Sequence, residues 1–562
     1  MTMASIQAAN SSRYIGHDSF LLPDKSVWNF WSDGQYNVYW KGLVFVSGIL
    51  SGSDSVKAFV AEMEEKGIES ACSILKGTYF FVIESKKKGV IHAFIDNSGL
   101  YHAYCTPEKV STSFLGLAES QGLTAADFDP GAVVEFLHFG SMLTGGTYLP
   151  SIRRIGKDDV LRIQQSHQQI TFIKKKGART LADPENPSKP FAQHFTEMAA
   201  SLRNCRVSVD LTGGADTRLV AAMLDRCGLQ FETASSGGVQ EYEDISISKQ
   251  VAEVMGRPWF GTIHSASTFE DDVEDMFEAT DGLYDLVYYH RLYQLQKDRR
   301  KRGIDTIVSG VGGELFKDFW WLHEFPFYSR GTSSIDRFVK MRIMSFEPMH
   351  GILSEKFEPS SRGLKHNLAK AFSVYVMDTN TKTFDNIFYN VLMGNVAGRI
   401  MTSHTHFVNC LAPFLDTGLA RMGFKLDRTR RVYNIFHRTE LTKINPALAR
   451  LRTSENGISV SSRPADMIYD LPAYINEKIK RVLIKLGASK SKKASLRNAP
   501  VFYSKVRQTR VMNQAFETLK ANGIINKKAE ASQVEDKYLG AFLALGMVAA
   551  RLDRHKKRTA LN

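Results

Sequence analysis

The sequence predicts an α/β protein, with a β-rich first domain followed by a doubly wound parallel sheet and a helical C-terminal part. Two observations predict this fold. Short alternating apolar runs, separated by turn residues and typical of strands, fill the chain to about residue 165. From Arg206 on, short apolar strands alternate with segments of helical periodicity, a pattern typical of a parallel sheet covered by helices.

The first domain is expected over residues 1–165. A helix is expected over Asp127–Leu143, entered through Asp129 and Pro130, because Asp can cap a helix and Pro suits its first turn. A linker of low apolar content, 174–189, follows. The strands predicted for this domain are Tyr36–Trp40, Leu43–Val46, Thr78–Glu84 and Val90–Ile95.

The second domain is expected over residues 190–470, and a basic, mainly helical extension over 471–562. Glycines close the two predicted helices of the second domain, as is common at helix C-termini. Ligands of such sheets bind beyond the carboxyl ends of the strands. The predicted strands are Val207–Leu211, Phe231–Ala234 and Thr306–Val308, and the predicted helices are Thr217–Arg226 and Asp244–Met255.

Composition limits the class of protein. Hydrophobic residues make up 43% of the 562 residues, and no apolar run approaches the roughly 18 residues that a membrane helix needs. The first residues lack the basic-then-apolar order of a secretory signal, so a cytoplasmic location is expected. Five scattered cysteines indicate neither a disulfide framework nor a zinc site. The net charge of +13 is concentrated in 478–497 and 551–558. This excess is either a solvated basic face or a contact for nucleic acid, an anionic membrane or a polyanionic substrate.

One segment carries a phosphate-binding pattern: an apolar strand, a Gly-Gly turn and the first turn of an amphipathic helix. The glycines let backbone amides approach an anion, and the helix start offers unpaired N–H groups. An acidic residue inside such a loop needs a cation between it and the phosphates, so it is a candidate Mg²⁺ ligand. The alternative is an ordinary strand-to-helix turn. The residues concerned are Leu211, Thr212, Gly213, Gly214, Asp216 and Thr217.

Three segments resemble one family. Leu211–Thr217 looks like the Ser-Gly-Gly-x-Asp-Ser loop of the N-type ATP pyrophosphatases, with Thr in place of both Ser. Ile307–Phe316 resembles the Ser-Gly-x-Gly-x-Asp-Glu-Leu-Phe motif of the asparagine synthetase superfamily, with one residue missing. Leu411–Asp416 matches the Val-Pro-Phe-Leu-Asp signature of the same superfamily. The resemblance spans roughly residues 200 to 460. For the second motif, the alternative is an ordinary glycine-rich turn.

The resemblance implies a site for ATP and Mg²⁺. The backbone around Ser235 would hold adenine beside Leu211, and Gly310 would lie near the phosphates. Asp216 and Glu314 would hold the metal, Glu314 replacing the family's Asp unless that ligand is deleted.

Candidate catalytic residues also follow from the resemblance. The family places a charge-stabilising Lys in an Arg-x-Lys-x-Gly segment, and Arg452 stands nearest to that position. Arginine can neutralise an anion but cannot donate a proton there. Lys443 and His437 are alternatives. Asp244 falls near the expected nucleotide, although a helix N-cap explains it equally well.

The first domain resembles the glutaminase domain of the same superfamily, an N-terminal-nucleophile hydrolase fold. The matching segments are Leu75–Ile83 and Phe94–Leu100, with Tyr104. A working glutaminase needs Cys directly after the initiator Met, and this chain has Thr2. The domain is therefore expected to be a retained scaffold, as in the β-lactam synthetases and lasso-peptide cyclases.

The expected function is that of an ATP-dependent, AMP-forming carbon–nitrogen ligase. A substrate carboxylate would be adenylated and then attacked by a substrate amine rather than by ammonia from glutamine. Two alternatives stay open: a nucleotide-dependent modifier of a nucleic acid or acidic substrate, and a degenerate ATP-binding scaffold of a biosynthetic complex. No nucleic-acid motif accompanies the basic charge. The sequence names neither substrate, and a homo-oligomer stays open.

Overall fold

The computed structural model describes most of the chain, and the statements on structure below concern those residues. They are 20–21, 28–164, 170–176, 181, 189–237, 242–263, 265–331, 334–344, 349, 351–454, 457–485 and 500–561. Thr2 and most of the predicted linker lie outside them.

An antiparallel six-stranded sheet forms the centre of the first region, in the order β12-β11-β7-β6-β3-β2. This sheet confirms three predicted strands, and the fourth becomes the short strand β4 (Phe45–Val46), paired with β5 (Leu75–Lys76). Gly42 ends β3 at φ +87°, a conformation that favours glycine, and turns the chain out of the sheet. The bounds are β2 Asn29–Ser32, β3 Tyr36–Gly42, β6 Tyr79–Ser85, β7 Val90–Ile95, β11 Asp159–Gln164 and β12 Ile170–Lys174.

Four helices and a small sheet accompany it. The predicted helix is confirmed as α4 (Pro130–Phe139), because the Asp129 carboxylate accepts the Ala132 amide at 2.8 Å and Gly140 closes the helix in the left-handed region. The other helices are α1 Ser53–Lys66, α2 Ile68–Ala71 and α3 Phe114–Ser120; the small sheet contains β1 Phe20–Leu21, β8 Tyr104–Cys105, β9 Val110–Ser111 and β10 Arg153–Arg154.

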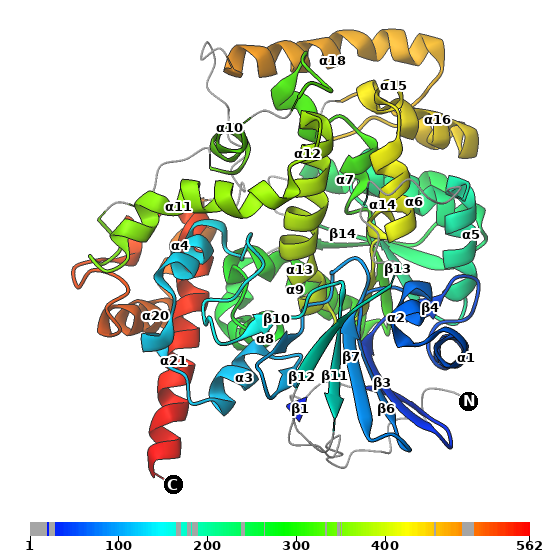
Figure 1. Cartoon of the computed structure of the whole chain (residues 1–562). Coiled ribbons are helices and arrows are strands. Elements are labelled where there is room, and N and C mark those ends of the chain that lie inside the picture. Colours follow the sequence, from blue (N-terminus) through cyan, green and yellow to red (C-terminus); the bar gives the residue numbers. More distant parts are fainter. Residues whose placement is uncertain are drawn as a thin grey trace.

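The second region is built on a parallel five-stranded sheet in the order β15-β14-β13-β16-β17, as the sequence predicts (Figure 1). The first strand in the sequence, β13, lies in the middle: Val207 pairs with Phe231 on one side and with Thr306 on the other. The loops after β13 and β16 therefore leave the same edge side by side. The strands are β13 Val207–Asp210, β14 Phe231–Gly237, β15 Trp259–Ile263, β16 Thr306–Val308 and β17 Asn409–Leu411.

Helices cover this sheet, and both predicted ones are confirmed. Helix α6 (Ala215–Arg226) buries Leu219 and Val220 against Val209 of the central strand. The remaining helices around the sheet are α5 Phe191–Ser201, α7 Tyr242–Met255, α8 Phe269–Thr280, α9 Leu286–Lys301, α14 Thr417–Lys425, α15 Arg428–Arg431, α16 Ile435–Ile444 and α17 Pro446–Arg450.

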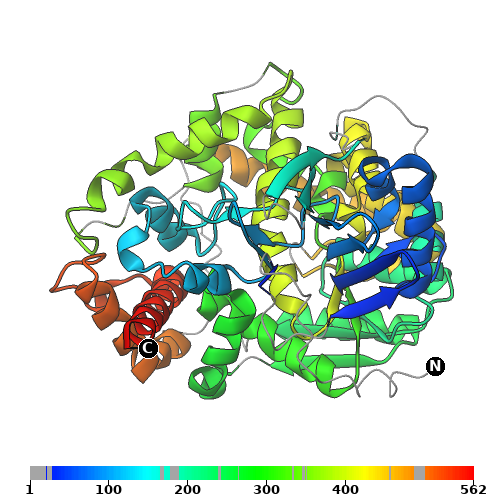
Figure 2. The same cartoon turned by 60° about the horizontal axis from the view of Figure 1, so that its bottom comes forward.

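The rest of the chain is mainly helical, again as predicted. Its last helix, α21 (Leu539–Leu561), packs against α4 and α9 (Figures 1 and 2). Phe136, Tyr289 and Leu545 of these three helices share one apolar core. The C-terminal region is thus joined to the first two, and the domain limits stay a prediction. Its other helices are α10 Ile335–Phe338, α11 Glu358–Phe372, α12 Asn380–Ile387, α13 Gly398–His404, α18 Pro464–Lys485, α19 Pro500–Arg507 and α20 Arg510–Ala521.

Two features of the C-terminal region bear on the charge and membrane predictions. Arg551 lies 2.7 Å from a carboxylate oxygen of Glu119, so part of the basic excess is neutralised internally. Among the described residues, every helix is too short or too polar to cross a bilayer.

Candidate functional site

The loop between β13 and α6 has the backbone arrangement of an anion site. Gly214 precedes α6 in an extended conformation, and no side chain caps the helix start. The first-turn amides of a helix have no partner inside it, so they are available to an anion. The two threonines brace the loop: Thr217 Oγ1 accepts the Thr212 amide, and Thr212 Oγ1 accepts the Gly214 amide, both at 3.1 Å.

The loop after β16 packs directly against this loop. A Cβ at Gly310 would lie 2.6 Å from the Thr217 amide nitrogen, too close for any other residue without a shift. A Cβ at Gly313 would overlap the Asp216 carboxylate. The two sequence motifs therefore meet at one sheet edge, and the glycines are needed for that close approach.

Asp216 faces the nitrogen atoms of two side chains, Lys317 and His437. Lys317 Nζ lies 2.5 Å from its Oδ2, and His437 Nε2 lies 2.8 Å from its Oδ1. Burial raises the pKa of Asp216, but Lys317 and His437 overcome this and hold it well below its usual range. Burial also lowers the pKa of His437, although Asp216 works in the opposite direction. Asp216 is therefore an ionised carboxylate with both oxygens facing nitrogen atoms.

This arrangement fits the predicted Mg²⁺ site poorly. A divalent cation on Asp216 would have to displace Lys317 or His437 from its oxygens. Glu314 lies on the short helix Gly313–Phe316, half-buried. Within the described part of the chain, no three His, Cys, Asp or Glu side chains are grouped so as to hold a metal ion. The metal role of Asp216 and Glu314 stays a prediction.

The Asp244 carboxylate accepts a hydrogen bond from one backbone amide of the loop. The Gly213 amide donates to Asp244 Oδ1 at 2.7 Å, and the Ser454 hydroxyl donates to the same oxygen at 2.6 Å. Asp244 lies in the first turn of α7, which begins at Tyr242, and is not its cap. A carboxylate thus binds where the sequence predicts phosphate, which indicates that this amide favours an anion.

Arg218, which the sequence analysis did not single out, ties the loop to the segment that precedes α18. Its guanidinium is fully buried and donates to the carbonyl oxygens of Gly213 at 3.2 Å, Leu451 at 2.7 Å and Arg452 at 3.1 Å. Burial lowers its pKa to about 10. Its only sequence signal is a charged residue among the apolar positions of a helix.

Comparison with known families agrees with this geometry. Residues 200–443 match the family model of asparagine synthase. The chain contains an asparagine synthase domain. No curated protein matches the chain significantly. This match supports an ATP-dependent amide ligase of the asparagine synthetase superfamily.

The two predicted catalytic residues lie in different surroundings. Lys443 is at the end of the asparagine synthase region, and Arg452 lies just beyond it. Arg452 reaches the loop through its main chain, whereas its side chain donates to the Gly457 carbonyl at 2.8 Å and to the Tyr469 hydroxyl at 3.3 Å. Lys443 is 60% exposed and pairs at 3.0 Å with Glu440 on its own helix, away from Asp216. The structure brings His437 rather than Lys443 to the loop.

The predicted adenine region joins the loop to β14. The Leu211 amide donates to the Ala234 carbonyl at 2.9 Å, and Leu211 is fully buried. The hydroxyls of Ser235 and Ser248 lie 2.9 Å apart in the interior. The adenine-binding role of Ser235 and Leu211 stays a prediction.

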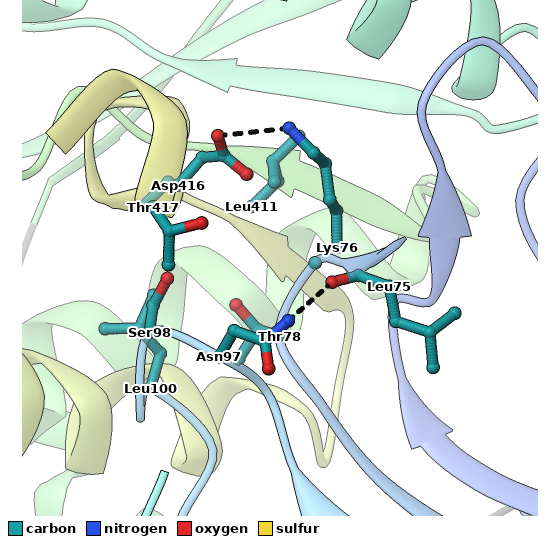
Figure 3. A pocket seen from close by; sticks show the side chains of 11 residues that line it. Leu75, Lys76, Thr78, Asn97, Ser98, Leu100, Leu411, Asp416 and Thr417 are labelled. Atoms are coloured by element: carbon teal, nitrogen blue, oxygen red, sulfur yellow. Dashed lines mark hydrogen bonds and ion pairs between the residues drawn. The ribbon is translucent and has the colours of Figure 1, made fainter. Parts of the chain in front are cut away.

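A small pocket lies where the asparagine synthase domain meets the first region (Figure 3). Lys76 pairs with Asp416 at 3.2 Å, and the Ser98 hydroxyl donates to the Leu415 carbonyl at 2.6 Å. The Leu411–Asp416 signature is therefore a contact with the first region. None of the residues that line this pocket comes from the Leu211–Thr217 loop.

Proposed function

We propose that this protein adenylates a substrate carboxylate with ATP and passes the acyl group to a substrate amine. A carboxylate oxygen attacks the α-phosphorus, the bond to the bridging oxygen breaks, and pyrophosphate leaves. The amine nitrogen then attacks the acyl carbon and loses a proton, and AMP departs as the amide forms. The reaction is that of an AMP-forming carbon–nitrogen ligase independent of glutamine.

The meeting of the two glycine loops beneath the uncapped start of α6 carries this proposal. Backbone amides that face outward are fixed donors for the charge on a departing pyrophosphate. The Leu211–Thr217 loop has no Gly-Lys-Ser/Thr ending of the type that grips a transferred γ-phosphate. Cleavage between the α and β phosphates is therefore the chemistry that this loop favours.

Lys317 is the proposed source of fixed positive charge beneath the loop. Mg²⁺ would neutralise phosphate charge if the protein supplied its ligands, but Asp216 already faces Lys317 and His437. The ammonium group can balance Asp216 without a metal, which removes the repulsion between this carboxylate and a phosphate. Arg452 would offset the charge on the reacting group once its side chain leaves Gly457.

Exchange of labelled pyrophosphate into ATP, across a panel of carboxylic acids, amino acids and peptides, tests the proposal. Exchange that depends on one class of acid supports adenylation and names the substrate class. A binding isotherm for ATP, measured on the same preparation, shows whether the absence of exchange reflects a failure to bind nucleotide. Binding without exchange in any acid would contradict the ligase assignment.

A second candidate function is an ATP-binding scaffold without turnover. Its specific support is the Asp244 carboxylate on the Gly213 amide, which competes with phosphate for a donor. Lys317 on Asp216 adds to it, because a metal-dependent reaction would lack that ligand. Under this alternative, ATP raises the melting temperature but is recovered intact with every acid.

A further inference from the structure

Helix α18 presents an apolar face to solvent. Figure 1 shows the helix at the outer edge of the molecule, lying across the helical region beyond the parallel sheet. Side chains that recur every three or four residues on one face form a stripe along a helix. The stripe residues, exposed by 40% to 71%, are Ile468, Tyr469, Leu471, Ile475, Ile479 and Leu483.

The opposite face of α18 is polar and points into the protein. Buried Asp470 lies 3.2 Å from Arg438, and Lys478 pairs with Asp318 in the interior. The Tyr474 hydroxyl accepts the Tyr433 amide at 3.1 Å. A surface helix of a globular protein normally buries its apolar face. Because α18 is fixed by polar contacts instead, most of its apolar stripe stays open to solvent, and among the stripe residues Tyr469 contacts Arg452.

The sequence at the C-terminal end of α18 is rich in basic residues. Beyond Lys478, which is paired in the interior, residues 480–497 contain seven Lys or Arg and no Asp or Glu, and those after 485 lie outside the described residues. Of the three acidic side chains of the helix, Asp466 pairs with Arg450, Asp470 is buried and Glu477 is half-buried. Lys480 is exposed. An apolar stripe beside four to eight basic residues is the pattern of helices that bind anionic lipid surfaces.

We propose that α18 docks the protein on an anionic membrane surface. The stripe would enter the boundary between headgroups and acyl chains, and the basic residues would meet the lipid phosphates. Nucleic acid would use the basic residues but leave the six apolar side chains in water. A second copy of this chain would bring two basic segments together, which opposes that contact.

Docking would also bring the proposed site close to the membrane. Tyr469, at one end of the stripe, accepts a hydrogen bond from Arg452, whose carbonyl Arg218 ties to the Leu211–Thr217 loop. The docking proposal does not depend on the proposed chemistry, because binding to lipid is measured without any substrate.

Vesicle flotation with the full-length protein tests the docking. Vesicles of phosphatidylcholine with phosphatidylglycerol are expected to carry the protein, vesicles of phosphatidylcholine alone much less, and high salt should weaken the binding. Replacing Ile468→Asn and Ile479→Asn together should lower the partition coefficient about tenfold or more. Val374→Asn is the matched control, because Val374 is 77% exposed on another element and should leave binding unchanged. Thermal melting shows that both variants fold.

Four results would overturn the proposal. They are no flotation with anionic vesicles, equal flotation with both lipid mixtures, full binding by the stripe variant, and loss of binding in the Val374→Asn control. Light scattering after size-exclusion chromatography tests the alternative, in which the stripe is a contact between two copies of this chain. If wild type is a dimer that the stripe variant makes monomeric, and neither binds vesicles, the stripe is an interface between copies.

Discussion

Lys317 Nζ and Asp216 Oδ2 lie 2.5 Å apart at the point where the two glycine loops meet. Asp216 is the acidic residue of the first motif, and Lys317 directly follows the second. The pair thus joins the two segments that carry the resemblance to the asparagine synthetase superfamily. The Lys317 ammonium group lies where the sequence predicts a metal ion. A variant that removes this group tests whether it takes the place of the metal.

Lys317→Met should destabilise the protein and create a response to Mg²⁺. Removing one partner of a buried ion pair costs about 3 kcal/mol or more, because the other charge stays buried. The freed Asp216 oxygen should then accept a divalent cation, so Mg²⁺ should raise the melting temperature of the variant but not that of wild type without nucleotide. Lys382→Met, at an exposed pair with Asp378, is the control and should cost less than about 1 kcal/mol. An equal rise in wild type would restore the metal assignment.

Asp244→Ala should tighten the binding of inorganic pyrophosphate and ATP. The Gly213 amide would lose its carboxylate partner, and a charge that repels phosphate would be gone. The gain should be about tenfold, the value of one charge-assisted hydrogen bond. Asp244→Asn keeps an acceptor without the charge and should give a smaller gain. Titration calorimetry measures both. Weaker binding in the alanine variant would mean that Asp244 supports the nucleotide instead.

Much of the fold and the meeting of the motifs could be predicted from sequence. The loops that contain Gly213 and Gly310 follow strands of one parallel sheet, and such strands end at a common edge. Lys317 escaped prediction because its contact with Asp216 depends on the short turn after β16. The orientation of α18 could not be predicted either. Periodicity shows that a helix has two faces, whereas the partners of Asp470 and Lys478 come from distant segments.

Glu135 should make the stability fall as pH rises from about 4.5 to about 7. Burial raises its pKa to about 7, although the Thr144 amide and hydroxyl donate to it. The folded state therefore binds more protons than the unfolded state between the ordinary glutamate value of 4.5 and about 7, and stability increases as pH falls through that window. Glu135→Gln should reduce the change of the free energy of unfolding with pH by up to about 1.4 kcal/mol per pH unit. Denaturant unfolding at several pH values measures it, with exposed Glu65→Gln as control. An unchanged slope in Glu135→Gln would contradict the assignment.

Arg452→Ala should reduce pyrophosphate exchange on the order of a hundredfold, the usual effect of losing one group that stabilises developing charge. Lys443→Ala should leave exchange unchanged, because Lys443 is 60% exposed and pairs with Glu440 on its own helix. Arg452→Lys distinguishes the role of the charge from that of the guanidinium geometry. Lysine keeps the positive charge but lacks the planar group whose two nitrogen atoms donate to Gly457 and Tyr469 together. Retained exchange in that variant, with the alanine variant inactive, would assign the role to charge alone. Full activity in all three variants would remove Arg452 from the mechanism and leave Lys317 and His437 as the groups that face Asp216.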